Sequence, residues 1–88
     1  MAKIIGYPVV ADVDFTTTET IIDIDDCYKL ILNPQESCSI SLNDNAHYKN
    51  YPKGIVLPIE IDSRNDKAIN KIYVKGSISG ILGVWGFK

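Results

Sequence analysis

The sequence predicts an all-β fold, a small antiparallel β-sandwich of about seven strands, with a jelly roll among the topologies that these strands allow. Ile and Val are the main apolar residues and Ala occurs only at positions 2, 11, 46 and 68, a composition that favours strands over helices. Short segments alternate apolar and polar residues, and turn-forming residues separate them at regular intervals. The 88 residues suffice for one domain, and we expect residues 1–88 to form it.

The first two predicted strands lie in the acidic N-terminal half of the chain. In residues 9–15, every second side chain is apolar and shares one face, while Asp12 and Asp14 lie on the other. Residues 21–25 repeat this alternation with aspartates on the outer face. Because successive strand side chains point to opposite faces, both segments are expected to be half-buried strands.

The next two predicted strands, residues 28–32 and 38–42, flank a turn that begins at Asn33-Pro34. We expect them to form a β-hairpin. Pairing Leu30 with Ile40 places the apolar residues of both strands on one face, whereas a slip of one residue would place serines opposite leucines. The hydrophobic pattern therefore favours the first register.

Residues 71–75 and 81–87 are expected to form a second hairpin, because a loop bounded by glycines separates them. Pairing Val74 with Leu82 gives this hairpin one apolar face. The opposite face of the hairpin then presents the apolar residues Tyr73, Ile81, Trp85 and Phe87.

Residues 54–62 form the remaining predicted strand. Pro58 within it has no N–H group to donate, so this strand is expected at a sheet edge or with a bulge. Residues 43–53 are the longest predicted loop. Residues 63–66 are expected to form a turn, and residues 67–70 a short helical turn.

The charged residues are unevenly distributed. Residues 1–44 contain two basic and eight acidic side chains, whereas residues 45–88 contain seven basic and three acidic ones. Such halves attract each other, either within one chain or between copies. The net charge of −2 disfavours nucleic acid, because phosphate binding needs a positive field.

Residues with catalytic or metal-binding chemistry are few. Cys27, Cys38 and His47 are the only cysteines and histidine, too few for a four-ligand zinc site without carboxylates. His47 lies in a polar loop beside Asp44, and the chain has no Gly-x-Ser-x-Gly nucleophile turn and no phosphate-binding glycine loop. The aspartate runs lack the spacing of a calcium loop. We therefore expect two free thiols, no cofactor, no metal and no enzymatic activity.

The apolar face of the last predicted hairpin has several interpretations. With Lys71, Lys75 and Lys88 its aromatic residues form a basic-aromatic cluster that is able to stack single-stranded nucleic acid or sugar rings. An exposed apolar patch of this kind more often marks a protein interface. We expect an interface formed by Tyr73, Ile81, Trp85 and Phe87.

Residues 52–55, 71–76 and 80–87 resemble the last third of short phage virion proteins. These are small β-sandwich modules that decorate capsids or form head-fibre and tail accessory parts. The resemblance implies a non-enzymatic homo-oligomer, with a trimer favoured, that binds other virion proteins such as the capsid or tail protein. It also implies a location in the virion after synthesis in the host cytoplasm.

The function expected from these observations is that of a non-enzymatic phage virion protein that self-associates and binds the capsid or tail surface. No stretch has the length or apolarity of a membrane span or a signal-peptide core, so we expect no membrane partner. Two alternatives are a carbohydrate- or receptor-binding module and a small single-strand nucleic-acid binder. The carbohydrate module would add loop residues to the same aromatics, namely Asn43, Asp44, His47, Tyr48 and Tyr51.

Overall fold

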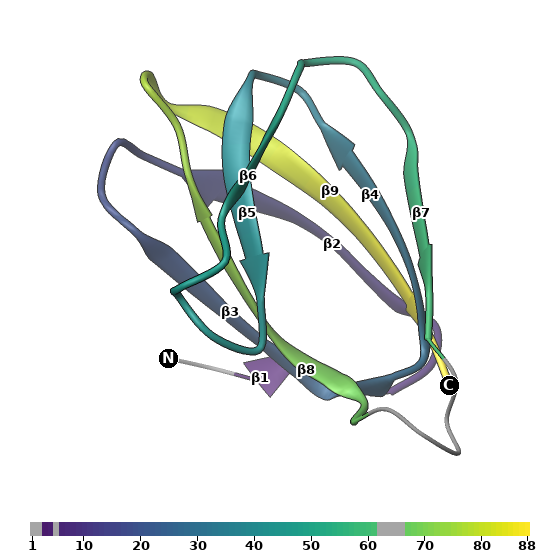
Figure 1. The fold of residues 1–88 in the computed structure, drawn as a ribbon. Helices are drawn as coiled ribbons and strands as arrows, with labels where there is room; N and C mark the ends of the chain where they lie inside the picture. Colours follow the sequence, from purple (N-terminus) through teal and green to yellow (C-terminus); the bar gives the residue numbers. More distant parts are fainter. Residues whose placement is uncertain (1–2, 5, 62–66) are drawn as a thin grey trace.

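The computed structural model, which describes residues 3–4, 6–61 and 67–88, is a sandwich of two β-sheets (Figure 1). The described residues form nine strands and no helix. One sheet has the strand order β1-β3-β8-β5-β6 and the other has the order β2-β9-β4-β7. The strands are β1 (Lys3–Ile4), β2 (Val9–Phe15), β3 (Thr20–Cys27), β4 (Lys29–Pro34), β5 (Cys38–Leu42), β6 (Lys49–Tyr51), β7 (Leu57–Glu60), β8 (Ile69–Lys75) and β9 (Gly80–Phe87).

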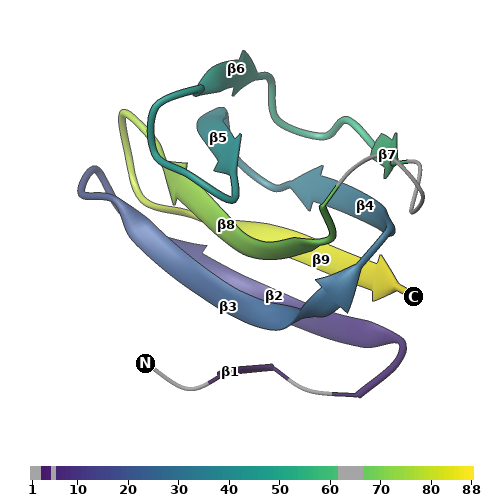
Figure 2. The same ribbon diagram turned by 60° about the horizontal axis from the view of Figure 1, so that its bottom comes forward.

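Four antiparallel strand pairs are nested within one another. β5 pairs with β6, β4 with β7, β3 with β8, and β2 with β9. Together the four pairs form one long hairpin of eight strands. This hairpin is rolled up, so that β9 also pairs with β4 and β8 also pairs with β5. Figure 2 shows the two layers that result. Strands far apart in the sequence therefore lie side by side in each sheet.

The prediction of an all-β sandwich is confirmed, and each of the seven predicted segments contains a strand. The predicted number of strands was too low, because β1 and β6 have only two and three residues and show no readable alternation. β7, which contains Pro58, is an edge strand as expected. Strand β8 begins at Ile69, so the helical turn predicted at 67–70 was wrong. The turn predicted at 63–66 lies outside the described residues.

Both predicted hairpins were wrong, although the predicted inward faces were right. β4 and β5 belong to different sheets, and so do β8 and β9. Each connection crosses from one sheet to the other at the same end of the sandwich, where Gly76 and Gly80 of the β8–β9 connection pack closely against the buried ring of Phe15 and against Ser37 and Glu36 of the β4–β5 connection. Period-two alternation shows which side chains face the core. It does not distinguish a partner beside the strand from a partner across the core.

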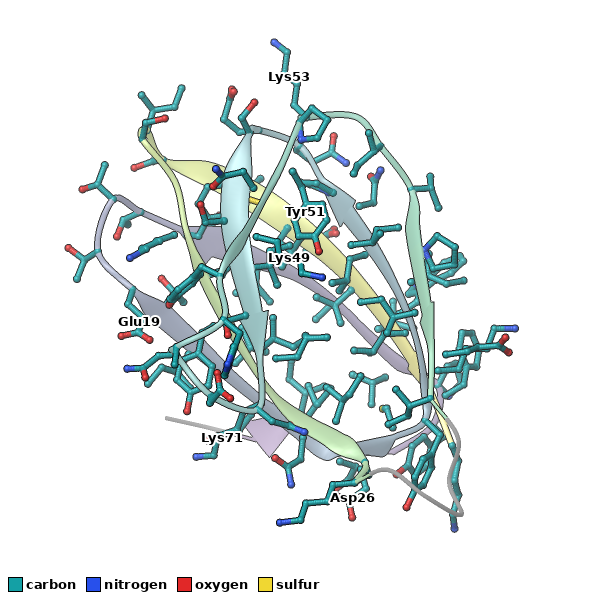
Figure 3. All side chains as sticks on the ribbon, viewed as in Figure 1. Glu19, Asp26, Lys49, Tyr51, Lys53 and Lys71 are labelled. Carbon is teal, nitrogen blue, oxygen red and sulfur yellow. The ribbon has the colours of Figure 1, made fainter. Side chains whose placement is uncertain are left out.

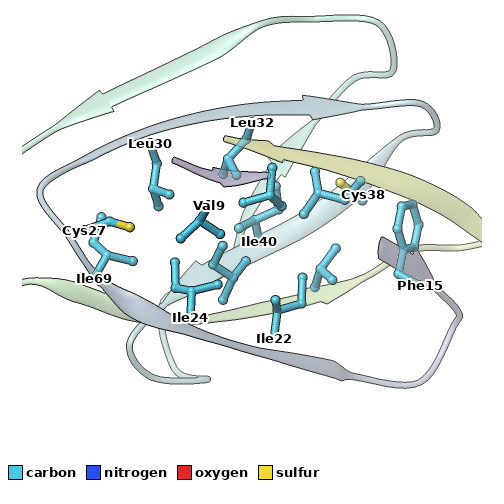
Figure 4. Close-up of a cluster of buried hydrophobic side chains, with 14 residues drawn as sticks. Val9, Phe15, Ile22, Ile24, Cys27, Leu30, Leu32, Cys38, Ile40 and Ile69 are labelled. Atoms are coloured by element: carbon cyan, nitrogen blue, oxygen red, sulfur yellow. The ribbon is translucent and has the colours of Figure 1, made fainter. Parts of the chain in front are cut away.

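The core is one cluster of mostly aliphatic side chains between the sheets (Figure 4). Phe15 lies at one end of the cluster, and Cys27 and Ile69 lie at the other. The register predicted for residues 28–32, with Leu30 facing the core, implies that Cys27 points outward. It is instead fully buried, because the register between β3 and β8 shifts between Asp23 and Cys27. Such an irregularity interrupts the alternation and turns the next side chain inward. The described core residues are Val9, Phe15, Ile22, Ile24, Cys27, Leu30, Leu32, Cys38, Ile40, Ile69, Ile72, Val74, Leu82 and Val84.

Gly86 on β9 is a sensitive position in this core. A methyl group there would approach the Sγ atom of Cys27 to 2.6 Å and a Leu30 methyl carbon to 3.2 Å. We expect Gly86→Ala to lower the free energy of unfolding by about 1–3 kcal/mol through overpacking, measured by urea denaturation.

Two further variants test whether overpacking causes the destabilisation. In Gly83→Ala the new methyl group meets nothing closer than 3.3 Å, so the loss is expected to be smaller. Adding Cys27→Ala to Gly86→Ala removes the clashing sulfur and should restore part of the loss. Equal losses in Gly83→Ala and Gly86→Ala, or no recovery in the double variant, would contradict this account.

Candidate functional site on the outer face of the four-stranded sheet

An unbroken apolar row crosses the outer face of the four-stranded sheet. Val10 of β2 lies opposite Trp85 of β9, Trp85 lies opposite Ile31 of β4, and Ile31 lies opposite Pro58 of β7. Trp85 is 52% exposed and Val10 is 56% exposed. Directly opposed side chains on one face are in contact range, so the row is a continuous surface.

Further apolar side chains extend this row. Ile81 on β9 and Val56 before β7 are exposed, the latter by 67%, and Phe87 at the end of β9 is half-buried. Contiguous apolar patches on a sheet face that is not covered by its own chain commonly mark an interaction site. We call this surface the Trp85 face; it comprises Val10, Ile31, Val56, Pro58, Ile81, Trp85 and Phe87.

A hollow of about 490 Å³ lies beside Trp85 on this face. Gly83, two residues from Trp85 on the same side of β9, has no side chain to fill it. Asp12 and Asn33 flank Gly83 on the neighbouring strands. The Asn33 amide donates a hydrogen bond to the carbonyl of Ile55 at 2.7 Å, which fixes its position. The hollow therefore combines an indole surface with a carboxylate and an amide.

The structure brings together three of the four residues predicted to form an interface. Ile81, Trp85 and Phe87 share the outer side of β9. Tyr73 lies on the other sheet, where its neighbours across the strands are Ile21 and Ser41. The predicted set was divided because β8 and β9 are not paired with each other.

Sequence reasoning missed Val10, Ile31 and Val56. The first two interrupt the polar faces of their strands, so that Val9-Val10 and Leu30-Ile31-Leu32 read as continuous apolar runs. Such runs indicate strands that are apolar on both faces. This signal was present in the sequence and would have extended the predicted interface onto β2 and β4.

The predicted basic-aromatic cluster is divided between the two outer faces of the sandwich. On the five-stranded sheet, the Lys71 ammonium lies 3.4 Å from the Asp23 carboxylate. The Lys75 ammonium lies 4.4 Å from the ring centre of Tyr48. Tyr48 in turn donates a hydrogen bond to Glu19 at 2.9 Å. These lysines have partners within the protein, and Trp85 lies on the opposite side.

Ser41, Asp44 and His47 hold the loop that follows β5. The buried hydroxyl of Ser41 donates to the Asp44 carboxylate at 3.2 Å and accepts the backbone N–H of His47 at 3.3 Å. The His47 ring lies 3.1 Å from the same carboxylate. Hydrogen bonds from the Ala46 backbone and the His47 ring lower the pKa of Asp44. Ser41 is thus directed toward a carboxylate and not toward the imidazole, an arrangement that stabilises the loop.

Both cysteines are buried and free. Burial raises the pKa of both thiols, and the nearby carboxylates of Asp25 and Asp26 raise that of Cys27 further. Within the part of the chain that the structure describes, no three His, Cys, Asp or Glu side chains are grouped to hold a metal ion. No helix in the described ranges is long and apolar enough to cross a membrane.

Comparisons with known proteins assign no family to the chain. No protein-family model matches it, and no curated protein matches it.

The Tyr48 contacts give a measurable prediction. Desolvation, followed by the hydrogen bond to Glu19, raises the pKa of Tyr48 to about 12. Because this lies above the ordinary value of 10.0, the associated stability is present below pH 10 and is lost as the pH rises toward 12. We expect Glu19→Gln to move the Tyr48 pKa part of the way back to 10, measured by NMR titration of the ring. An unchanged pKa in this variant would show that Glu19 has no part in the shift.

Proposed function

We propose that this protein is a non-enzymatic structural module that associates with copies of itself and with other protein surfaces through the Trp85 face. The observation that carries this proposal is the apolar row from Val10 through Trp85 and Ile31 to Pro58, which spans the whole width of one sheet. A core already lies beneath the inner side of this sheet, so the row adds nothing to the monomer's own core.

The composition of the Trp85 face supports a protein partner. Tryptophan is strongly enriched among the residues that dominate binding energy at interfaces, and such residues are typically surrounded by contacts that exclude water. Here Trp85 lies in the interior of the sheet between β2 and β4. At one end of the face, Lys29 and Glu60 lie 3.9 Å apart and provide a polar rim. An apolar centre with a polar rim is the ordinary anatomy of an interface.

We further propose that the domain is a small jelly roll and that its place is in a phage virion. The four nested strand pairs support the first part, since a rolled long hairpin of eight strands is the connectivity of a jelly roll. The resemblance of residues 52–55, 71–76 and 80–87 to virion proteins supports the second part. The partners proposed on this basis are the capsid or tail protein and further copies of the chain, with a trimer favoured.

The contrast between Trp85 and Tyr73 tests the proposed association surface. We expect the wild-type protein to form oligomers in light scattering at micromolar concentration, and Trp85→Ala to weaken association at least thirtyfold, which corresponds to the loss of about 2 kcal/mol expected of an interface hot spot. Tyr73→Ala removes an aromatic ring from the opposite face and should leave the mass unchanged.

Two outcomes of this experiment would reject self-association through the Trp85 face. One is a wild-type protein that remains a monomer at every concentration. The other is an oligomer that Tyr73→Ala dissociates and Trp85→Ala does not. Thermal unfolding of both variants provides the control for folding.

The hollow beside Trp85 supports carbohydrate binding as a second candidate function. An indole surface next to a carboxylate and an amide suits a sugar ring, whose apolar face stacks on an aromatic ring while its hydroxyls donate to carboxylates. The Asp12 carboxylate has no hydrogen-bond or ion-pair partner among the described residues. The nucleic-acid alternative receives less support, because Lys71 and Lys75 lie on the other sheet with partners of their own, and of the three lysines in that cluster Lys88 alone follows β9.

A glycan array followed by titration with any sugar that binds tests this second candidate. If Asp12 accepts a sugar hydroxyl, Asp12→Asn should weaken binding about tenfold, the usual cost of losing a hydrogen bond to a charged group. The matched control is Asp14→Asn, the next outward position on β2, which does not line the hollow. An array without binding, or equal effects of the two variants, would count against carbohydrate recognition here.

A further inference from the structure

We infer that the open side of the sandwich, between β6 and β7, binds a single-chain aliphatic carboxylate. A hollow of about 280 Å³ lies there. It is separate from the Trp85 face and the inference does not depend on the function proposed above. We call this hollow the edge slot; it is lined by Ile40, Leu42, His47, Lys49, Tyr51, Leu57 and Ile59.

The edge slot exists because the two sheets do not close on this side. β6 is the last strand of one sheet and β7 is the last strand of the other, and they are not hydrogen-bonded to each other. Figure 2 shows both at the same side of the sandwich. β6 pairs with β5 only from Cys38 to Ile40, so the end of β5 at Leu42 has no β6 residue beside it. The inner side chains near this end are left partly uncovered.

The walls of the edge slot are apolar. Leu42, Leu57 and Ile59 are half-buried side chains that pack against the core, and Ile40 behind them is buried. Covering their remaining exposed surface with hydrocarbon is favourable. The volume is just below the range of about 300–1,000 Å³ that is typical of sites for small molecules. It therefore suits an unbranched alkyl chain better than a fused ring system.

The rim of the edge slot is cationic and rich in hydrogen-bond donors. Figure 3 shows Lys49 and Tyr51 extending from β6 over the space between the sheets. Among the described residues, neither the Lys49 ammonium nor the Tyr51 hydroxyl has a hydrogen-bond or ion-pair partner. The His47 ring, by contrast, is already held by the Asp44 carboxylate. Lys49 and Tyr51 are therefore available to donate to the two oxygens of a carboxylate.

Decanoate, used below its micellar concentration, is the probe for the edge slot. We expect saturable NMR shifts in the ¹⁵N-labelled full chain that are confined to the backbone amides around Leu42, Tyr51, Leu57 and Ile59. Octanoate should bind about tenfold more weakly, because two fewer methylene groups are buried. Decanol, which has the same chain without the charge, should also bind more weakly than decanoate.

Three variants test which side chains contribute to decanoate binding. Lys49→Ala should weaken decanoate binding about threefold to fivefold, as expected for a partly exposed ion pair. Lys53→Ala should leave it unchanged, since Lys53 points away from the edge slot (Figure 3). Leu57→Glu should abolish binding by placing a carboxylate among the apolar walls. If Leu57→Glu does not fold, the two lysine variants still test the inference. Both lysines are exposed, so their substitution should leave the fold intact.

Several results would overturn the inference. These are an absence of saturable shifts at millimolar decanoate, shifts centred on Trp85, or equal affinities for decanoate and decanol. A protein whose oligomers dissociate on addition of decanoate would show that a second copy occupies the edge slot instead. Trp85→Ala should bind decanoate as the wild type does, so failure of the proposed association leaves this test unaffected.

Discussion

Leu82 and Val84 of β9 point into the core, and the strict alternation of a strand then requires Ile81 and Trp85 to point out of it. A shift of one residue would bury the tryptophan and expose the two aliphatic side chains. Because β9 pairs with both β2 and β4, the same constraint turns Val10 and Ile31 outward beside Trp85. The burial of one aliphatic core thus determines which side chains the outer face presents.

Because the long hairpin is rolled up, residues that are distant in the sequence lie together on the two candidate binding surfaces. Val10, Ile31 and Trp85 come from three strands spread over most of the chain, yet they form one row. The edge slot likewise combines the end of β5 with β6 and β7. Both surfaces follow from the nesting of strand pairs. The outer face lies where the central strands meet, and the edge slot lies where the innermost pairs end.

The strands and their inward faces could be predicted from the sequence, because period-two alternation is a local property. Val9–Phe15 and Cys38–Leu42 were predicted with the bounds that the structure has. The partners of each strand could not be predicted in this way. A hairpin and a crossing between sheets bury the same residues, and what distinguishes them here is the pairing of each strand with segments distant in the sequence.

This limitation explains why the candidate site was only partly foreseen. Trp85, Ile81 and Phe87 share one strand, so alternation alone groups them. Tyr73 was added through a pairing that does not occur, and Val10 and Ile31 were missed because their strands join β9 only in three dimensions. The edge slot depends on where β6 stops, and a three-residue strand leaves too short a pattern to read.

Trp85 is the single tryptophan of the chain, and it is half-exposed at the centre of the outer face. The indole emission of this protein therefore comes from one place, and its wavelength depends on how much water surrounds that place. Covering the outer face would shift the emission to the blue, whereas filling the edge slot leaves the indole surroundings as they are. The fold thus supplies an intrinsic optical reporter that distinguishes occupancy of the two surfaces without any label.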